Sequence, residues 1–211
     1  MEILLMPQTL LTPIPRIADI IPVNEVTLLT ALPGSGKSYT ILKFLNINNI
    51  KPIYFNLDED AALQTFSAYH FGKEFIGAVM NQEVTDLKDQ VIVIDHYLRL
   101  TLVLDMPENT QMQQIKIAKQ LEDLAHQQQC TVILIAHPED YVGRSSIFKD
   151  NPYIVRNCAE HLHLDKIVST KKHSKPEYRF YVNKGRGIGG STTYEDWLRE
   201  PMLNPLTNKV C

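Results

Sequence analysis

The sequence predicts an α/β fold with a mainly parallel sheet flanked by helices and a β-hairpin near the C-terminus. Three observations support this prediction. Short β-rich or fully apolar runs alternate with helical segments between residues 25 and 135. Residues 91–94 are β-branched throughout, which is typical of a strand buried on both faces. Residues 161–168 and 178–182 alternate on either side of a basic turn, which predicts the hairpin.

The first half of the chain is expected to contribute three strands and a helix. Strands are predicted over residues 25–30, 52–57 and 91–94. A turn that contains glycine ends the first of them, and the following residues 36–46 suit a helix packed on a sheet. The apolar residues of this helix are Ile41, Leu42, Phe44 and Leu45.

The second half is expected to begin with an amphipathic helix over residues 110–128, because apolar residues recur there every three or four positions. These residues are Met112, Ile115, Ala118, Leu121 and Ala125. Residues 131–135 are fully apolar and predict the next buried strand. Residues 139–157 are polar and irregular, so we expect one long surface loop, or two short ones, suited to movement.

Composition is consistent with one domain over residues 1–211, with a core at about 24–190, an N-terminal extension at 1–23 and a C-terminal tail at 191–211. Hydrophobic residues make up 44% and charged residues 21%, which is ordinary for a soluble protein without membrane contact. Glu2 and the early prolines argue against a signal peptide. The 3 cysteines, Cys130, Cys158 and Cys211, lack metal-ligand spacing, which favours a reduced, cytoplasmic chain.

The clearest chemical motif is a glycine-rich loop between the first predicted strand and the first predicted helix. Glycines let backbone N–H groups turn toward phosphates, and a helix that begins near Gly36 directs its positive dipole end at them. Lys37 is expected to reach the β- and γ-phosphates, and the Ser38 hydroxyl to bind Mg²⁺. The generic pattern has glycine where this chain has Ala31. We expect ATP to be bound by Ala31, Leu32, Pro33, Gly34, Ser35, Gly36, Lys37 and Ser38.

Carboxylates follow two other predicted strands. Asp95, at the end of residues 91–94, is expected to hold Mg²⁺ beside the loop; the alternative is an aspartate that caps the strand. A general base is needed to orient the attacking water, and Asp58 or Glu59 is available after the second strand. The residues alone do not separate these two, and acidic residues are also common at a helix N-terminus.

Three further polar residues are candidates for contacts with the γ-phosphate. His137 follows the strand over residues 131–135, where it would report the presence of that phosphate; a lone histidine is more often structural. Lys184 and Arg186 are spaced to point the same way from an extended segment. They would neutralise charge on a neighbouring subunit's γ-phosphate, or they belong to an ordinary basic turn.

The basic residues are unevenly distributed. The formal net charge is −3, yet residues 139–186 carry 10 basic and 6 acidic side chains, against 9 and 15 in residues 1–138. The later segment is therefore where a polyanion would bind. The alternative is a solvated basic face without a ligand.

Together these motifs resemble the RecA-like motor domain of DnaB-type replicative helicases and their phage relatives. That family typically has alanine at the start of its phosphate loop, as at residues 31–33 here. Residues 91–96, Val-Ile-Val-Ile-Asp-His, resemble its Walker B strand, and residues 133–137, Ile-Leu-Ile-Ala-His, resemble its sensor strand. Residues 157–162 resemble the strand after its second DNA-binding loop, and residues 181–190 resemble its segment that carries a trans-acting lysine and arginine.

The resemblance implies a RecA-like P-loop NTPase with specific residue roles. It implies phosphate and Mg²⁺ contacts for Lys37, Ser38 and Asp95, a sensor role for His137, and action across a subunit interface for Lys184 and Arg186. The family's catalytic glutamate falls on Asp58, so either the water is positioned differently or Glu59 takes the role. The DNA-contacting loop maps to about residues 139–152, where Arg144 and Lys149 are the expected phosphate ligands.

The expected partners are single-stranded DNA, further copies of the chain in a hexameric ring, and replication proteins. Only about 24 residues precede the first core strand, so we expect the ring to close through the core domain or through a partner. The leading hypothesis is an ATP-hydrolysing DNA helicase or translocase that acts in replication. The alternatives are a non-translocating RecA-like ATPase (a recombination mediator, helicase loader or regulatory switch) and a nucleotide-dependent binding module. A small-molecule kinase ranks last.

Overall fold

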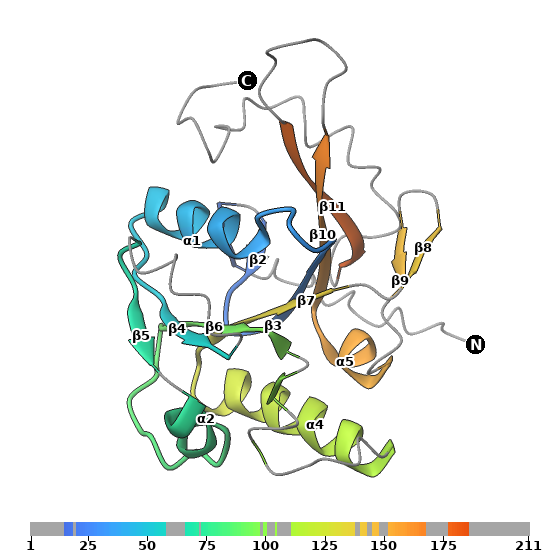
Figure 1. The fold of residues 1–211 in the computed structure, drawn as a ribbon. Helices are drawn as coiled ribbons and strands as arrows, with labels where there is room; N and C mark the ends of the chain where they lie inside the picture. Colours follow the sequence, from blue (N-terminus) through green and yellow to red (C-terminus); the bar gives the residue numbers. More distant parts are fainter. Residues whose placement is uncertain are drawn as a thin grey trace, which may run out of the picture.

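A seven-stranded sheet lies at the centre of the fold, with the order β11-β10-β3-β7-β6-β4-β5 (Figure 1). The computed structural model describes residues 15–18, 20–57, 66–71, 73–97, 99–100, 104, 111–137, 140–142, 145–147, 152–167 and 177–185. Six neighbouring strands are parallel, namely β10 (Glu160–Ile167), β3 (Val26–Ala31), β7 (Thr131–Ala136), β6 (Val91–Asp95), β4 (Ile53–Asn56) and β5 (Tyr69–Phe71). The predicted α/β class with a mainly parallel sheet is confirmed.

The last strand, β11 (Glu177–Gly185), pairs antiparallel with β10, with Lys166 opposite Tyr178 and Glu160 opposite Gly185. The predicted C-terminal hairpin is therefore present. Strand β10 has the predicted length but begins and ends one residue earlier, and β11 is longer than the alternating run 178–182 that predicted it.

Helices cover both faces of the sheet, as Figure 1 shows. One face packs against α1 (Lys37–Ile47) and a small hairpin of β1 (Arg16–Ile17) and β2 (Ile21–Pro22). The other face packs against α2 (Lys73–Met80), α4 (Gln111–Gln127) and α5 (Pro152–Asn157). Because successive side chains of a strand point to opposite faces, the apolar strands supply both cores.

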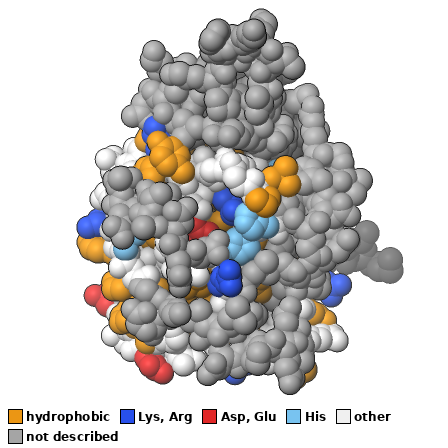
Figure 2. Space-filling view, viewed as in Figure 1, with side chains coloured by type: hydrophobic (Ala, Val, Ile, Leu, Met, Phe, Trp, Pro, Cys, Tyr) orange, Lys and Arg blue, Asp and Glu red, His pale blue; other side chains and the backbone are white. Residues whose placement is uncertain are grey.

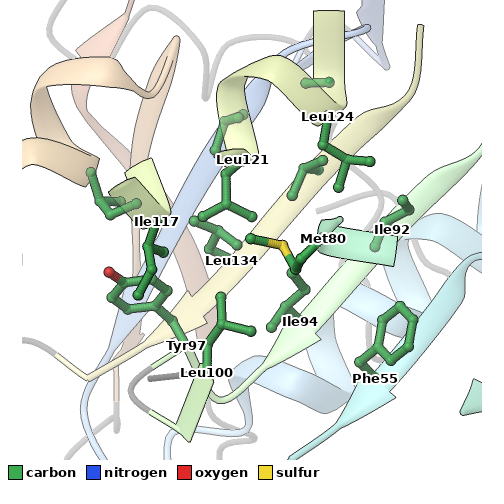
Figure 3. Close-up of a cluster of buried hydrophobic side chains, with 14 of the residues drawn as sticks. Phe55, Met80, Ile92, Ile94, Tyr97, Leu100, Ile117, Leu121, Leu124 and Leu134 are labelled. Atoms are coloured by element: carbon green, nitrogen blue, oxygen red, sulfur yellow. The ribbon is translucent and has the colours of Figure 1, made fainter. Parts of the chain in front are cut away.

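Figure 3 shows part of the core on the α4 face, where side chains of α2, α4 and residues 97–100 meet side chains of β4, β6 and β7. The labelled residues are Phe55, Met80, Ile92, Ile94, Tyr97, Leu100, Ile117, Leu121, Leu124 and Leu134. All of them are buried.

Helix α4 matches the predicted bounds to within one residue, but part of the predicted apolar face was wrong. Its buried residues are Ile117, Ala118, Leu121, Leu124 and Ala125, whereas Met112 is 75% exposed and Ile115 38% exposed. Met112 precedes Leu121 by nine residues, or about two and a half helical turns, so it lies on the opposite side. The stripe that packs on the sheet is centred on Leu121.

The segment predicted as one or two surface loops, residues 139–157, contains regular structure, so that prediction was wrong in part. Strands β8 (Asp140–Val142) and β9 (Ser145–Ile147) pair antiparallel, and α5 follows. Helix α5 begins at Pro152, whose fixed φ suits the first helical position. It is anchored because Ile154 and Cys158, four residues apart, are both buried in the core below the sheet.

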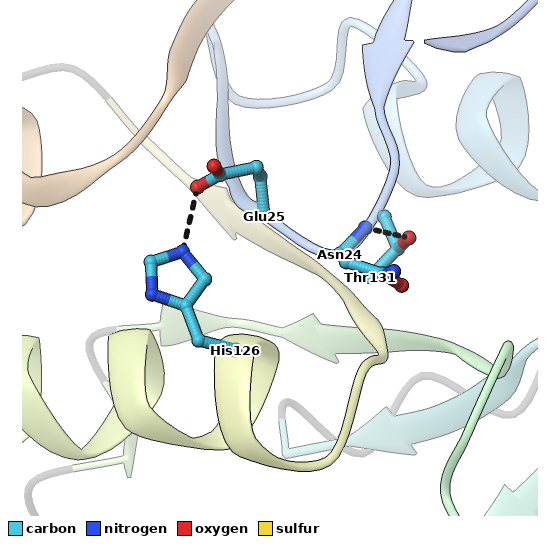
Figure 4. Close-up of polar contacts among 4 residues, drawn as sticks. All are labelled: Asn24, Glu25, His126 and Thr131. Atoms are coloured by element: carbon cyan, nitrogen blue, oxygen red, sulfur yellow. Dashed lines mark hydrogen bonds and ion pairs between the residues drawn. The ribbon is translucent and has the colours of Figure 1, made fainter. Parts of the chain in front are cut away.

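Polar contacts tie the start of β3 to α4 and β7 (Figure 4). His126 Nε2 lies 3.0 Å from Glu25 Oε2, and the Asn24 amide donates a 3.0 Å hydrogen bond to Thr131 Oγ1. These contacts lie at the end of the sheet where β3 and β7 begin. They do not involve the opposite edge of the sheet, where both strands end.

Several polar side chains are buried within the sheet. Thr30 Oγ1 lies 3.0 Å from both His161 Nε2 and His163 Nδ1, which links β3 to β10. Glu160 pairs with Arg16 at 2.8 Å; burial raises the pKa of Glu160 above its ordinary value, and Arg16 partly offsets that rise. Burial also raises the pKa of the Cys130 thiol to about 12.

Among the residues that the structure describes, no helix has both the length and the apolar character needed to cross a membrane.

The assignment of Leu121 as buried and Met112 as exposed on α4 predicts that alanine substitutions at these two positions change the stability by different amounts. Leu121→Ala should lower the free energy of unfolding by about 2–5 kcal/mol, because it opens a cavity beneath the sheet. Met112→Ala should change it by less than about 0.5 kcal/mol, because Met112 is exposed. Urea denaturation of both variants measures this; equal losses would contradict the assignment of the buried stripe.

Candidate functional site

Three neighbouring strands of the sheet end at one edge and bring the predicted site residues together. Strand β7 lies between β3 and β6, with Thr30 opposite Ala136 and Asp95 opposite Ile135. Asp95 and His137 therefore project from the same face of the sheet, which is the face that α1 covers. Figure 2 shows basic, acidic and histidine side chains gathered in a depression on this side of the molecule.

The loop from β3 to α1 has the backbone that its glycines allow. Gly34 and Gly36 have φ of +70° and +81°, which residues with a Cβ rarely adopt. A Cβ on Gly34 would meet no atom within 4 Å, so conformation and not crowding accounts for this glycine. The Ser35 amide donates to the Leu32 carbonyl at 3.2 Å.

Ser35 also carries a buried hydroxyl inside this loop. The residue is 6% exposed, and its Oγ has no hydrogen-bond partner among the residues that the structure describes. A buried hydroxyl without a partner is unfavourable. The loop is therefore chemically suited to a ligand that accepts hydrogen bonds.

Helix α1 begins at Lys37 with features that favour an anion. Its N-cap residue is Gly36, which makes no side-chain cap, and its first turn contains no acidic residue. The N-terminal amides and the helix dipole therefore present positive charge at the loop. Ser38 lies in this first turn and is partly exposed.

The side chain of Lys37 turns from the helix toward the end of β7. It is 9% exposed, and its Nζ lies 3.1 Å from Nε2 and 3.3 Å from Nδ1 of His137. His137 Nδ1 also lies 3.2 Å from the Ala31 carbonyl oxygen. The consistent tautomer is a neutral ring whose Nδ1–H donates to Ala31 while Nε2 accepts from Lys37.

A second histidine, His96, supports the first. Its ring centroid lies 4.4 Å from that of His137, with 30° between the ring planes, and the residue is buried. His96 directly follows Asp95, and the peptide bond between them is cis. The sequence motif contained His96, but nothing in the sequence assigned it a contact with His137.

Asp95 is held by a tyrosine that sequence reasoning missed. The residue is 5% exposed, and its Oδ2 accepts a 2.6 Å hydrogen bond from the Tyr54 hydroxyl. The Asp95 carbonyl also accepts from the Leu57 amide, next to the end of β4. Tyr54 lies on the adjacent strand β4, so only the strand order reveals this contact.

The donor set of the site fits a polyphosphate with a bound Mg²⁺. Lys37 and the helix amides are able to donate to phosphate oxygens, whereas the Ser38 hydroxyl and the Asp95 carboxylate are oxygen ligands of the kind that Mg²⁺ prefers. The Tyr54 hydroxyl donates to Oδ2 of Asp95 and so holds this carboxylate in place. His137 adds a group that can accept or donate a proton next to Lys37.

The structure does not describe the side chains of the other predicted site residues. Asp58, Glu59, Arg144, Lys149 and Arg186 lie outside the described residues. The backbone of Lys184 lies in β11 opposite His161, and its side chain is not among those described.

Comparison with known proteins adds no family assignment. No protein-family model matches this sequence, and no curated protein matches it significantly. Within the described residues, no group of three or more His, Cys, Asp or Glu side chains is arranged to hold a metal ion by itself.

The contact between Tyr54 and Asp95 predicts a stability loss from removing a single hydroxyl. Tyr54→Phe should lower the free energy of unfolding by about 1.5–3 kcal/mol, the range for a hydrogen bond to a charged group. The control is Tyr69→Phe on β5, because Tyr69 is 49% exposed and its loss should be near zero. Thermal denaturation of the two variants distinguishes them, and equal midpoints would argue against the buried hydrogen bond.

Proposed function

We propose that this chain binds and hydrolyses ATP with Mg²⁺, as a RecA-like P-loop motor of the ring-helicase kind that acts on single-stranded DNA. One observation carries the nucleotide part of the proposal. Lys37, from the glycine-rich loop and its helix, contacts His137 at the end of the neighbouring strand, and Asp95 ends the strand beyond it. These are the three positions at which an ATPase of this kind holds phosphate, senses it and binds Mg²⁺.

In this proposal the loop and the first turn of α1 bind the β- and γ-phosphates. The amides of the turn and the Lys37 ammonium neutralise the phosphate charge. The hydroxyl of Ser35, which is buried and has no partner among the described residues, gains an acceptor in a phosphate oxygen. A ligand with closely spaced anionic oxygens satisfies all of these donors together.

Ser38 and Asp95 would hold the Mg²⁺. Bound Mg²⁺ supplies charge neutralisation at the phosphate oxygens during transfer to water. Tyr54 keeps the carboxylate of Asp95 oriented through its 2.6 Å hydrogen bond. Asp95 is 5% exposed, so its interaction with a cation would be only weakly screened.

His137 suits the role of a phosphate sensor because His137 and the phosphate would compete for the same Lys37 ammonium. Nε2 of His137 accepts from Lys37 at 3.1 Å, and a phosphate that draws Lys37 away removes that donor. With a proton on Nε2, the ring can then donate a hydrogen bond to a phosphate oxygen. His137 directly precedes the segment that carries Arg144 and Lys149, so a change in its position would act on that segment through the chain.

Hydrolysis and movement on DNA rest on residues whose side chains the structure does not describe. Asp58 or Glu59 would orient the water, and Arg186 with Lys184 would act on a neighbouring copy's nucleotide in a hexameric ring. Arg144 and Lys149 would contact the DNA backbone. The support for these roles is the resemblance of the motifs and their order along the chain.

The nucleotide site is tested by titrating the purified chain with ATP and Mg²⁺. Lys37→Ala should weaken ATP binding by about 10- to 100-fold, because it removes a charge-assisted contact with phosphate. Lys51→Ala is the matched control, since Lys51 lies over the Tyr69 ring, away from the loop. If both variants bind ATP like the parent chain, the site is not a phosphate site.

The motor part is tested by measuring hydrolysis and particle mass with and without single-stranded DNA. A motor should hydrolyse ATP faster when DNA is added and should form a ring-sized assembly. A chain that remains monomeric, with hydrolysis unchanged by DNA, would instead fit the non-translocating ATPase. A chain that binds ATP without hydrolysing it would fit a nucleotide-dependent binding module.

A further inference from the structure

We infer that Tyr39 and Phe66 form an aromatic platform for the base of the bound nucleotide. This inference rests on the proposed function, because it takes the triphosphate to lie along residues 31–38. It goes further by assigning a base-binding site to residues that the phosphate-loop motif does not include.

The two rings stand next to the loop. Tyr39 is the second residue after Lys37 in α1 and is 40% exposed, so its ring is accessible beside the buried Lys37. Its ring packs edge-to-face on Phe66, with centroids 4.9 Å apart and 76° between the planes. Figure 2 shows hydrophobic side chains at the rim of the depression, over α1.

Phe66 is held in place by hydrogen bonds to the same helix. Asn46 Nδ2 donates to the Ser67 carbonyl at 2.9 Å, and the Ser67 amide donates to Asn46 Oδ1 at 2.9 Å. Tyr39 and Asn46 lie on one side of α1, seven residues apart, so the chain that carries Phe66 runs along the side that carries Tyr39. Two segments of the chain therefore build the platform, and they are joined by the contact between the Tyr39 and Phe66 rings and by the hydrogen bonds between Asn46 and Ser67.

The direction of the triphosphate leads to this platform. Lys37 and Asp95 are buried, so the γ-phosphate end belongs deep at the edge of the sheet. The nucleoside is attached at the other end of the triphosphate, which must point outward past Ser38. Along this turn Lys37 is buried and Ser38 is partly exposed, and Tyr39, the next residue, is exposed.

The chemistry of the platform suits a nucleobase attached to an anion. Any of the nucleobases can stack on an exposed aromatic ring, because every base has a π-face. The Lys43 ammonium lies 5.9 Å from the centroid of the Tyr39 ring and adds positive charge beside it. An apolar partner would gain less from this cation than a nucleotide would.

The test compares two ligands that share the phosphates and differ in the base. ATP and inorganic tripolyphosphate, each with Mg²⁺, are titrated into the full chain and its variants by calorimetry. Tyr39→Ala should weaken ATP binding about tenfold, the size expected for the loss of one base–aromatic stack, and leave tripolyphosphate binding unchanged. Tyr39→Phe should retain most of the ATP affinity, and retained tripolyphosphate binding shows that each variant is folded.

Two results would overturn the inference while leaving the phosphate site in place. One is ATP affinity in Tyr39→Ala equal to that of the parent chain. The other is an equal loss for ATP and tripolyphosphate, which would mean that Tyr39 acts through the loop. If the parent chain binds neither ligand, the proposed function itself fails, and the base platform fails with it.

Discussion

The parallel alignment of β3, β7 and β6 is the constraint on which the site depends. The register matches Thr30 with Ala136 and Ile135 with Asp95, so the three strands end within a residue of one another. Asp95, the last residue of β6, and His137, the first residue after β7, therefore lie at one edge of the sheet and on one face. The middle position of β7 puts His137 between the glycine-rich loop and Asp95, and it accounts for the contact with Lys37. A different strand order with the same motifs would separate them.

This arrangement also explains how charged groups are tolerated in a largely buried edge. The Lys37 ammonium has a histidine acceptor at 3.1 Å, and the Asp95 carboxylate has a tyrosine donor at 2.6 Å. Such pairing offsets the desolvation that burial imposes on each charge. Contacts at the other end of the strands, such as Glu25 with His126, fasten the sheet without occupying this edge. The contacts that fasten the sheet and the polar groups proposed to bind phosphate thus lie at opposite ends of the strands.

The sequence could predict the features that depend on local pattern. Apolar β-branched runs predicted the central strands, and the glycines at 34 and 36 marked a turn that needs positive φ. It could not predict contacts that depend on which strands are neighbours, such as Tyr54 with Asp95 or His96 with His137. Periodicity overstated the apolar face of α4, because Met112 continues the spacing without facing the sheet. Helix α5 was missed because a six-residue helix has too few positions to show a period.

The most direct test of the central claim is NMR of the histidine ring nitrogens as Mg²⁺ and a non-hydrolysable ATP analogue are added. If Lys37, His137 and Asp95 form one phosphate site, the His137 Nε2 resonance should shift strongly as Lys37 transfers to phosphate, and His96 should shift with it. His126 is an internal reference, because its partner Glu25 lies where the strands begin. Its resonance should stay constant. An unchanged His137 resonance at saturating nucleotide would contradict the account.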